Sequence, residues 1–112
     1  MIPKENRLKK KKEFNFVFQK GRSVNGRYVR IKYKELKGKK IGFVAPVKEF
    51  RKATERNKVK RKLRESFRKF IPNLKDDIGI IVIAKKDIEV KNVEEVGEIM
   101  EKILIKHKLL KR

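Results

Sequence analysis

Apolar side chains recur at helical spacing close to the start of the chain. Within residues 7–19, Phe14, Val17 and Phe18 stand at positions i, i+3 and i+4. A helix of 3.6 residues per turn brings these three side chains to one face, so the pattern predicts a short amphipathic helix. Gly21 follows directly and is expected to end it, because glycine adopts backbone conformations that other residues avoid.

The next part of the chain shows the spacing of β-strands. Residues 28–33 alternate strictly between side chains suited to a core and more polar side chains. This alternation predicts a strand buried on one face only. Residues 41–47 are a second apolar run, and Pro46 indicates that this strand ends or lies at a sheet edge near that point. Residues 37–38 offer a turn between the two runs, so we expect a hairpin. The core face of the first strand consists of Val29, Ile31 and Tyr33, and its other face of Tyr28, Arg30 and Lys32.

The second half of the chain predicts two further helices around a buried strand. Residues 53–70 carry apolar side chains at helical spacing, and Pro72 ends this helix. Residues 78–84 form a continuous apolar run, which predicts a strand covered on both faces. Asn92 can cap the last helix, with Glu95 three residues on in the arrangement of a capping box. The apolar faces of the two helices consist of Val59, Leu63, Phe67 and Phe70, and of Val96, Ile99, Met100, Ile103 and Leu104.

The predicted elements follow the order α, β, β, α, β, α, which indicates an α/β (α+β) protein. A chain of 112 residues can bury one modest core but not two, so we expect a single domain over residues 1–112. The sequence contains no internal repeat and no low-complexity linker that would divide it.

The charge of the chain narrows the choice of partner. Lys and Arg number 35 against 14 acidic residues, a formal net charge of +21. Self-repulsion of this size favours a polyanionic partner, whereas solubility alone needs far fewer net charges. No stretch approaches the roughly 20 apolar residues of a membrane-spanning helix, and the basic helices also carry a core face. We therefore expect nucleic acid, not a membrane, as the partner.

Composition also bears on the compartment. Cysteine is absent, which excludes disulfides and thiolate metal sites. The chain runs from Met1 into a lysine-rich segment without the apolar region of a signal peptide, so we expect a cytoplasmic protein. Abundant Lys, Glu and Ile with a single Gln is a composition found in heat-adapted proteins.

Residues for protein-based catalysis are scarce. A metal-dependent nuclease needs clustered carboxylates, but the only aspartates are Asp76, Asp77 and Asp87, close to the ends of the strand at 78–84. His107, the sole histidine, is expected to end the last helix and not to act as a general base. Neither serine has a recognisable base partner. We therefore expect no catalytic residue, and no metal or cofactor held by the protein alone.

The helix predicted over residues 53–70 carries the most specific signal. Opposite its apolar side, a stripe at positions i, i+4, i+7 and i+11 presents guanidinium groups that suit phosphates. An ordinary solvated face is the alternative, but such faces mix both signs of charge, whereas this helix holds only Glu55 and Glu65 among many cations. The stripe consists of Asn57, Arg61, Arg64 and Arg68, bordered by Lys60 and extended by Arg56 and Lys62.

Residues 56–65, Arg-Asn-Lys-Val-Lys-Arg-Lys-Leu-Arg-Glu, closely resemble the RNR signature of the bacterial ribonuclease P protein family, in which RN is followed by KR and then R at this spacing. Two departures from the family pattern precede it. Arg51 stands where members usually have Gly, and the segment between Gly42 and Arg56 is one residue longer. The other matching features, in the same order, are Arg7 with Leu8, Phe14 to Phe18, Gly21, Ile41 with Gly42, Lys48, Ala53 and the apolar strand after the motif.

The resemblance implies a particular fold. Members of the family are α/β two-layer sandwiches with three helices and a mixed sheet of about four strands, in the order α-β-β-(β)-α-β-α. The RNR helix of such a fold lies in a left-handed βαβ crossover. The fourth strand is then a short segment that the hydrophobic pattern does not locate.

The resemblance also implies a function. Members are protein subunits of ribonuclease P, a ribonucleoprotein endonuclease (a hydrolase) of tRNA processing in bacteria. They bind the catalytic RNA and precursor tRNA and need no other protein partner. The RNA subunit, with Mg²⁺, hydrolyses the phosphodiester that joins the 5′ leader to the mature tRNA, and the protein alone is inactive. A ribosomal-type or chaperone RNA-binding protein without a role in tRNA processing is the alternative.

The family's second RNA surface is a cleft between the first helix and the sheet, which receives the single-stranded leader. By resemblance Phe14 and Phe18 belong to it, with Val17 beside them, and aromatic rings can stack on any base. Core packing is the alternative for these three, because Phe at helical spacing is more often buried than stacked on a base. The sheet and the following loop would contribute Tyr28, Arg30, Lys32 and Lys48.

Overall fold

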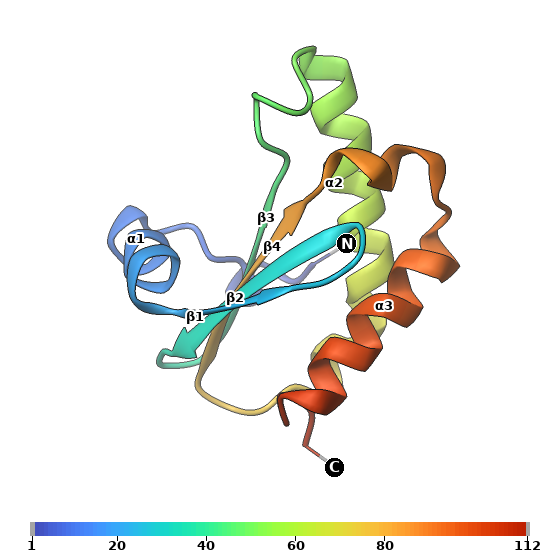
Figure 1. The fold of residues 1–112 in the computed structure, drawn as a ribbon. Helices are drawn as coiled ribbons and strands as arrows, with labels where there is room; N and C mark the ends of the chain where they lie inside the picture. The colour runs from blue at the N-terminus through green and yellow to red at the C-terminus, as the bar shows by residue number, and fades with distance from the viewer. Residues whose placement is uncertain (1, 112) are drawn as a thin grey trace.

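The computed structural model describes residues 2–111, which form three α-helices, four β-strands and three short 3-10 helices (Figure 1). A mixed four-stranded sheet with three helices confirms the predicted fold class. No helix within these residues combines the length and apolar character that crossing a membrane requires. The elements are η1 (Lys4–Asn6), α1 (Lys11–Lys20), β1 (Arg22–Asn25), β2 (Val29–Glu35), β3 (Lys39–Val44), α2 (Ala53–Phe67), η2 (Arg68–Asn73), β4 (Ile78–Ala84), η3 (Lys86–Val90) and α3 (Val93–Lys106).

The four strands form one sheet in the order β1-β2-β4-β3. β2 pairs antiparallel with β1 and β4, whereas β3 pairs in parallel with β4. The predicted hairpin between the strands at 28–33 and 41–47, now β2 and β3, is therefore wrong, because β4 lies between them. Strands adjacent in sequence are often adjacent in a sheet, but the apolar β4, covered on both faces, takes a central place here. The strand that the hydrophobic pattern did not locate is β1, at one edge.

Different helices cover the two faces of the sheet. α2 and α3 lie against one face and α1 against the other (Figure 1). In β2, Val29 and Ile31 are buried in the main core, while Arg30 is exposed and Lys32 half-buried on the side of α1. The predicted alternation is thus confirmed from Val29 onward. Tyr28 has a φ of 67° and precedes the strand, so it falls outside the alternation.

The main core fills the space between the sheet and the layer of α2 and α3. Apolar burial on this scale is the dominant favourable contribution to folding. The predicted inner faces of the two helices are buried there, apart from Ile99, which is half-buried at the margin. The largest fully buried side chains of this cluster are Phe50, Phe67, Ile31, Ile41, Leu63, Leu74, Ile80, Ile88, Met100, Leu104 and Leu109.

Helix α1 begins at Lys11, later than the predicted start at residue 7, and ends before Gly21 as predicted. Arg7 forms a parallel bridge with Ile41, and the amide of Leu8 donates a 3.0 Å hydrogen bond to the Ile41 carbonyl. This pairing holds the segment along the outer edge of β3, so the helix cannot start there. Under α1, a second and smaller core consists of Leu8, Val17 and Ile81.

The C-terminal end of α2 differs from the prediction, whereas the N-terminal cap of α3 agrees with it. α2 is α-helical to Phe67 and continues as the 3-10 helix η2, which contains Pro72. The predicted α-helix to residue 70 is thus three residues too long, because the chain tightens into η2 before the proline. The predicted cap of α3 is confirmed, since the Glu95 amide donates to the Asn92 side chain at 2.8 Å.

Candidate nucleic-acid interface

Helix α2 presents the predicted basic stripe to solvent. Val59 and Leu63 are buried on the opposite side, which fixes the rotation of the helix. Asn57, Arg61 and Arg64 are exposed. In the part of the chain that the structure describes, neither arginine forms an ion pair. Their guanidinium groups are therefore free to bind phosphates.

Arg56, the first residue of the RNR motif, contacts protein as well as solvent. Its Nη1 donates hydrogen bonds to the carbonyls of Phe50 at 3.0 Å and Arg51 at 2.8 Å. These carbonyls belong to the loop between β3 and α2, in which the chain departs from the family pattern. Arg56 therefore anchors this loop, and its side chain remains partly exposed to solvent.

Two other cations expected on this surface, Lys62 and Arg68, also contact protein groups. Lys62 points away from the stripe, since its Nζ donates to the carbonyls of Ile88 at 2.9 Å and Glu89 at 3.3 Å. Its predicted contribution to the basic surface is wrong, because it holds η3 against α2. Arg68 lies 3.7 Å from the Glu65 carboxylate in a pair that is about half exposed, so it remains within reach of RNA.

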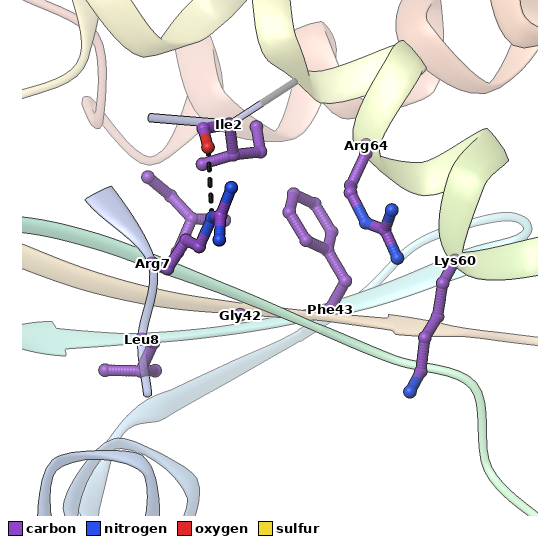
Figure 2. Close-up of a pocket in the computed structure, with 8 residues that line it drawn as sticks. Ile2, Arg7, Leu8, Gly42, Phe43, Lys60 and Arg64 are labelled. Carbon is purple, nitrogen blue, oxygen red and sulfur yellow. Dashed lines mark hydrogen bonds between the residues drawn. The ribbon is translucent and has the colours of Figure 1, made fainter. Parts of the chain in front are cut away.

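A cavity of about 420 Å³ opens at the outer edge of β3, between the N-terminal segment and α2 (Figure 2). Lys60 and Arg64 reach it from α2, and Arg7 reaches it from the segment before α1. Figure 2 shows the Phe43 ring of β3 between Arg7 and Arg64. Among residues 2–111, none that lines the cavity carries a carboxylate. The other lining residues are Ile2, Leu8, Ile41 and Gly42.

The aromatic residues of α1 lie on the other face of the sheet. The rings of Phe14 and Phe18 are nearly parallel, at 13°, with centroids 6.0 Å apart. Phe18 is 40% exposed, so it is not a core residue, whereas Phe14 is half-buried beside the second core. Lys32 of β2 places its ammonium 3.9 Å from the Phe18 ring centroid. The structure thus brings two predicted cleft rings and one predicted cation together.

Two residues expected in the cleft do not face it. Val17 has no exposed surface and lies in the second core, so it supports α1 from beneath. Tyr28 packs against the main core, and Lys91 lies 5.5 Å from its ring centroid. Because the positive φ of Tyr28 takes it out of the strand, its side chain does not share the face of Arg30 and Lys32.

A cavity of about 560 Å³ brings together Arg30 and Lys48, two further residues expected in the cleft. Arg30 lies on the same face of β2 as Lys32, so the cavity continues the surface beside α1. Lys86 also lines it, and the hydrogen bond that its ammonium donates to the Glu89 carboxylate raises the pKa of this lysine. The remaining lining residues are Pro46, Glu49, Ile83, Ala84, Lys85 and Asp87.

Two of the three aspartates have structural partners, and the histidine ends a helix. Asp76 pairs with Lys39 at 3.7 Å, and Asp77 accepts a 2.9 Å hydrogen bond from the Gly38 amide. His107 is the C-cap of α3, as predicted. Within residues 2–111, no three His, Cys, Asp or Glu side chains come together in a group that could hold a metal ion.

Sequence reasoning missed Phe43 and the cavity that it lines. Phe43 stands two residues after Ile41 in the strand. It is half-buried and lines the cavity. In the sequence, Arg7 is only one of the residues that match the family pattern. The pairing of its segment with β3, which brings it to the cavity, has no signal in local periodicity.

The sequence matches the family model described as Ribonuclease P over residues 2–108. It is 34% identical to the ribonuclease P protein component of a Pseudanabaena species, over 98% of this chain and 97% of the relative. The corresponding protein of Dictyoglomus turgidum is 37% identical, over 99% of this chain and 96% of the relative.

Solved structures show the same fold. The RNase P protein of Staphylococcus aureus superposes with a TM-score of 0.79 at 26% identity, covering 96% of this chain and 99% of that one. The RNase P protein of Thermotoga maritima gives a TM-score of 0.74 at 29% identity, covering 88% of this chain and 94% of that one. The similarity in sequence and in structure therefore extends over nearly the whole chain.

Proposed function

The chain belongs to the bacterial ribonuclease P protein family, and from this membership we propose how it binds its RNA partners. It is the protein subunit of a ribonucleoprotein endonuclease and serves in tRNA processing. We propose that α2 binds the catalytic RNA and that the α1 side of the sheet binds the 5′ leader of precursor tRNA.

The observation that carries this proposal is the placement of two basic surfaces on opposite faces of one sheet. α2, which carries the stripe, lies against one face of the sheet, and α1 lies against the other (Figure 1). Phe18 belongs to α1 and contacts Lys32 of β2, and the neighbouring cavity is lined by Arg30 and Lys48. Two RNA segments can therefore bind at the same time without competing for residues. A protein that joins a catalytic RNA to its substrate needs this property.

The chemistry of the α2 surface suits a folded RNA. Arg61 and Arg64 present planar forks to phosphate oxygens, and Asn57 adds an uncharged donor and acceptor on the same stripe. Each phosphate that such a cation neutralises releases counterions, which makes binding favourable and dependent on salt.

The α1 side suits a single strand of variable sequence. Phe18 offers an exposed ring, and every base has a face that can stack on it. Lys32, Arg30 and Lys48 lie where the backbone of such a strand would run. Together they would recognise a leader by its single-stranded form and charge and not by its bases.

We assign the hydrolysis itself to the RNA subunit with Mg²⁺. Asp76 and Asp77 are engaged in structural contacts, which supports a protein without a catalytic centre of its own. By neutralising phosphates, the protein would lower the Mg²⁺ concentration that the RNA needs. The site of this activity would be the cytoplasm.

Reconstitution tests the proposal. The purified protein is mixed with a ribonuclease P RNA and a precursor tRNA at low Mg²⁺, and cleavage at the 5′ end of the mature tRNA is measured. We expect cleavage when protein and RNA are both present and none with protein alone. Robust cleavage by nuclease-free protein without RNA, or no stimulation of the RNA, would contradict the proposal.

A further inference from the structure

We propose that the cavity at the edge of β3 holds one unpaired nucleotide of the catalytic RNA, with its base against Phe43 and its phosphate between Lys60 and Arg64. The inference rests on the proposed function, because it specifies the kind of nucleotide that the α2 side binds. Because Arg7 lines the same cavity, the N-terminal segment is then also part of the RNA-binding surface.

The ring of Phe43 is fixed before any ligand binds. Its centroid lies 5.9 Å from that of Phe67, a fully buried residue of α2, in an edge-to-face arrangement at 74°. The side chain is half-buried, and its other side lines the cavity. A ring already held by the core loses little conformational freedom when a base stacks on it.

The charges of the cavity select an anion. Arg7, Lys60 and Arg64 all line it, and no carboxylate of the described part of the chain does. Arg7 is held in place by a 3.1 Å hydrogen bond from its Nε to the Ile2 carbonyl. Three like charges around one cavity repel one another, and a phosphate lowers that repulsion. A neutral or cationic ligand would leave it in place.

The shape of the cavity selects an unpaired nucleotide. Its volume of about 420 Å³ lies within the range of roughly 300–1,000 Å³ that small-molecule sites occupy. Bases of an A-form helix remain stacked on their neighbours and cannot enter such a space, whereas a base in a loop or bulge can leave the stack. The ring and the cations then bind the two parts of a single nucleotide.

A peptide strand is a poorer occupant of the same edge. Leu8 already donates to the Ile41 carbonyl, so the N-terminal segment covers part of the outer edge of β3. Lys60 and Arg64 flank the part that is left. A second copy of this chain would also bring another formal charge of +21 to a basic cavity.

Substitution of the ring separates stacking from charge. Phe43→Leu keeps apolar bulk against Phe67 and should weaken binding of the catalytic RNA about tenfold, with an unchanged salt dependence because no charge is lost. Phe43→Tyr retains the ring and should bind as the unchanged protein does. Phe16→Leu is the matched control, since Phe16 is 41% exposed on α1 and should leave this affinity unchanged. Equal affinity of a folded Phe43→Leu protein would overturn the inference.

Photocrosslinking identifies the bound nucleotide and does not depend on the stability of the Leu variant. A benzophenone side chain at position 43 should crosslink to one unpaired nucleotide of the catalytic RNA. Crosslinks spread over paired segments, or none in a complex that forms normally, would overturn the inference while leaving the proposed function intact. Failure of the unchanged protein to bind the catalytic RNA would instead reject the proposed function.

Discussion

The ammonium of Lys32 lies 3.9 Å from the centroid of the Phe18 ring and donates a 2.9 Å hydrogen bond to the Phe18 carbonyl. β2 and α1 are thus joined by a cation–π contact at the surface proposed for the leader. A base that stacks on the covered face of the ring must displace the ammonium, which then becomes free for a phosphate. The two side chains should therefore act as one unit toward RNA.

Removal of the Phe18 ring should reduce the preference of the holoenzyme for precursor over mature tRNA. A stacked base contributes roughly 1–3 kcal/mol, so Phe18→Leu should lower the ratio of the two dissociation constants about fivefold or more. Assembly with the catalytic RNA should stay nearly unchanged, because α2 is on the other face of the sheet. A folded Phe18→Leu variant with an unchanged ratio would exclude this ring as a leader contact.

The double variant Phe18→Leu, Lys32→Ala tests whether the pair acts as a unit. Lys32→Ala alone should weaken leader binding and make it less dependent on salt, because a charge is lost. If the two residues are coupled, the double variant should lose less than the sum of the single losses. Additive losses, within about 0.5 kcal/mol, would show that the side chains act independently.

Loss of Arg61 should weaken binding of the catalytic RNA without affecting the fold. Arg61 is exposed and opposite the buried side of α2, so Arg61→Ala should lower the slope of log affinity against log salt by about one unit. The measurement is a titration at several salt concentrations. Lys102→Ala removes one exposed charge from α3 and is the control. The same slope for both variants would mean that the stripe is only a solvated face.

Arg56→Ala should differ from Arg61→Ala by destabilising the protein. It removes the hydrogen bonds to the Phe50 and Arg51 carbonyls, and hydrogen bonds from charged groups contribute roughly 1.5–3 kcal/mol. Because Arg56 is only half-buried, we expect the lower end and a fall in Tm of about 5–10 °C. Thermal denaturation monitored by circular dichroism measures it. A Tm equal to that of Arg61→Ala would show that the loop does not depend on this side chain.

Replacing Gly79 or Gly97 by alanine should change the stability of the protein in opposite directions. An added Cβ at Gly79 would lie 2.8 Å from Val17 Cγ2 and 2.9 Å from Leu36 Cδ2, so Gly79→Ala should destabilise the protein by about 1–3 kcal/mol through overpacking under α1. At Gly97, in helix α3, the nearest atoms lie at 3.5 Å, and Gly97→Ala should stabilise it by roughly 0.5–1 kcal/mol. Urea denaturation of both variants compares the two. Equal stabilities would contradict the packing described for α1.

The sequence predicts an element well when the signal for that element is local. The bounds of β4 and the Asn92 cap of α3 follow from a run of apolar residues and from one side-chain hydrogen bond. β1 was not predicted because Val24 is its only apolar residue. Its pairing with β2 and the packing of Val24 against the main core hold it in the sheet. The order of the strands also has no local signal, since β4 is distant in sequence from the strands that it separates.

The same distinction applies to the candidate interface. The exposure of Arg61 and Arg64 follows from helical periodicity, because Val59 and Leu63 fix which side of α2 is buried. The inward contacts of Arg56 and Lys62 have no signal in helical periodicity, because their acceptors are backbone carbonyls outside α2. Those of Arg56 lie in the loop just before the helix, and that of Ile88 lies in η3. The proposed roles of the exposed residues in RNA binding stay predictions until the variants are measured.

The central place of β4 has a consequence for how the chain matures during synthesis. The ribosome makes β2 and β3 first, but each pairs with β4, which ends only at Ala84 of a chain of 112 residues. Until that segment emerges, β3 lacks the strand with which it pairs in the folded sheet. Unpaired strand edges and exposed apolar residues promote aggregation of nascent chains. The lysines and arginines that surround these strands would then keep the unfinished chains apart by mutual repulsion.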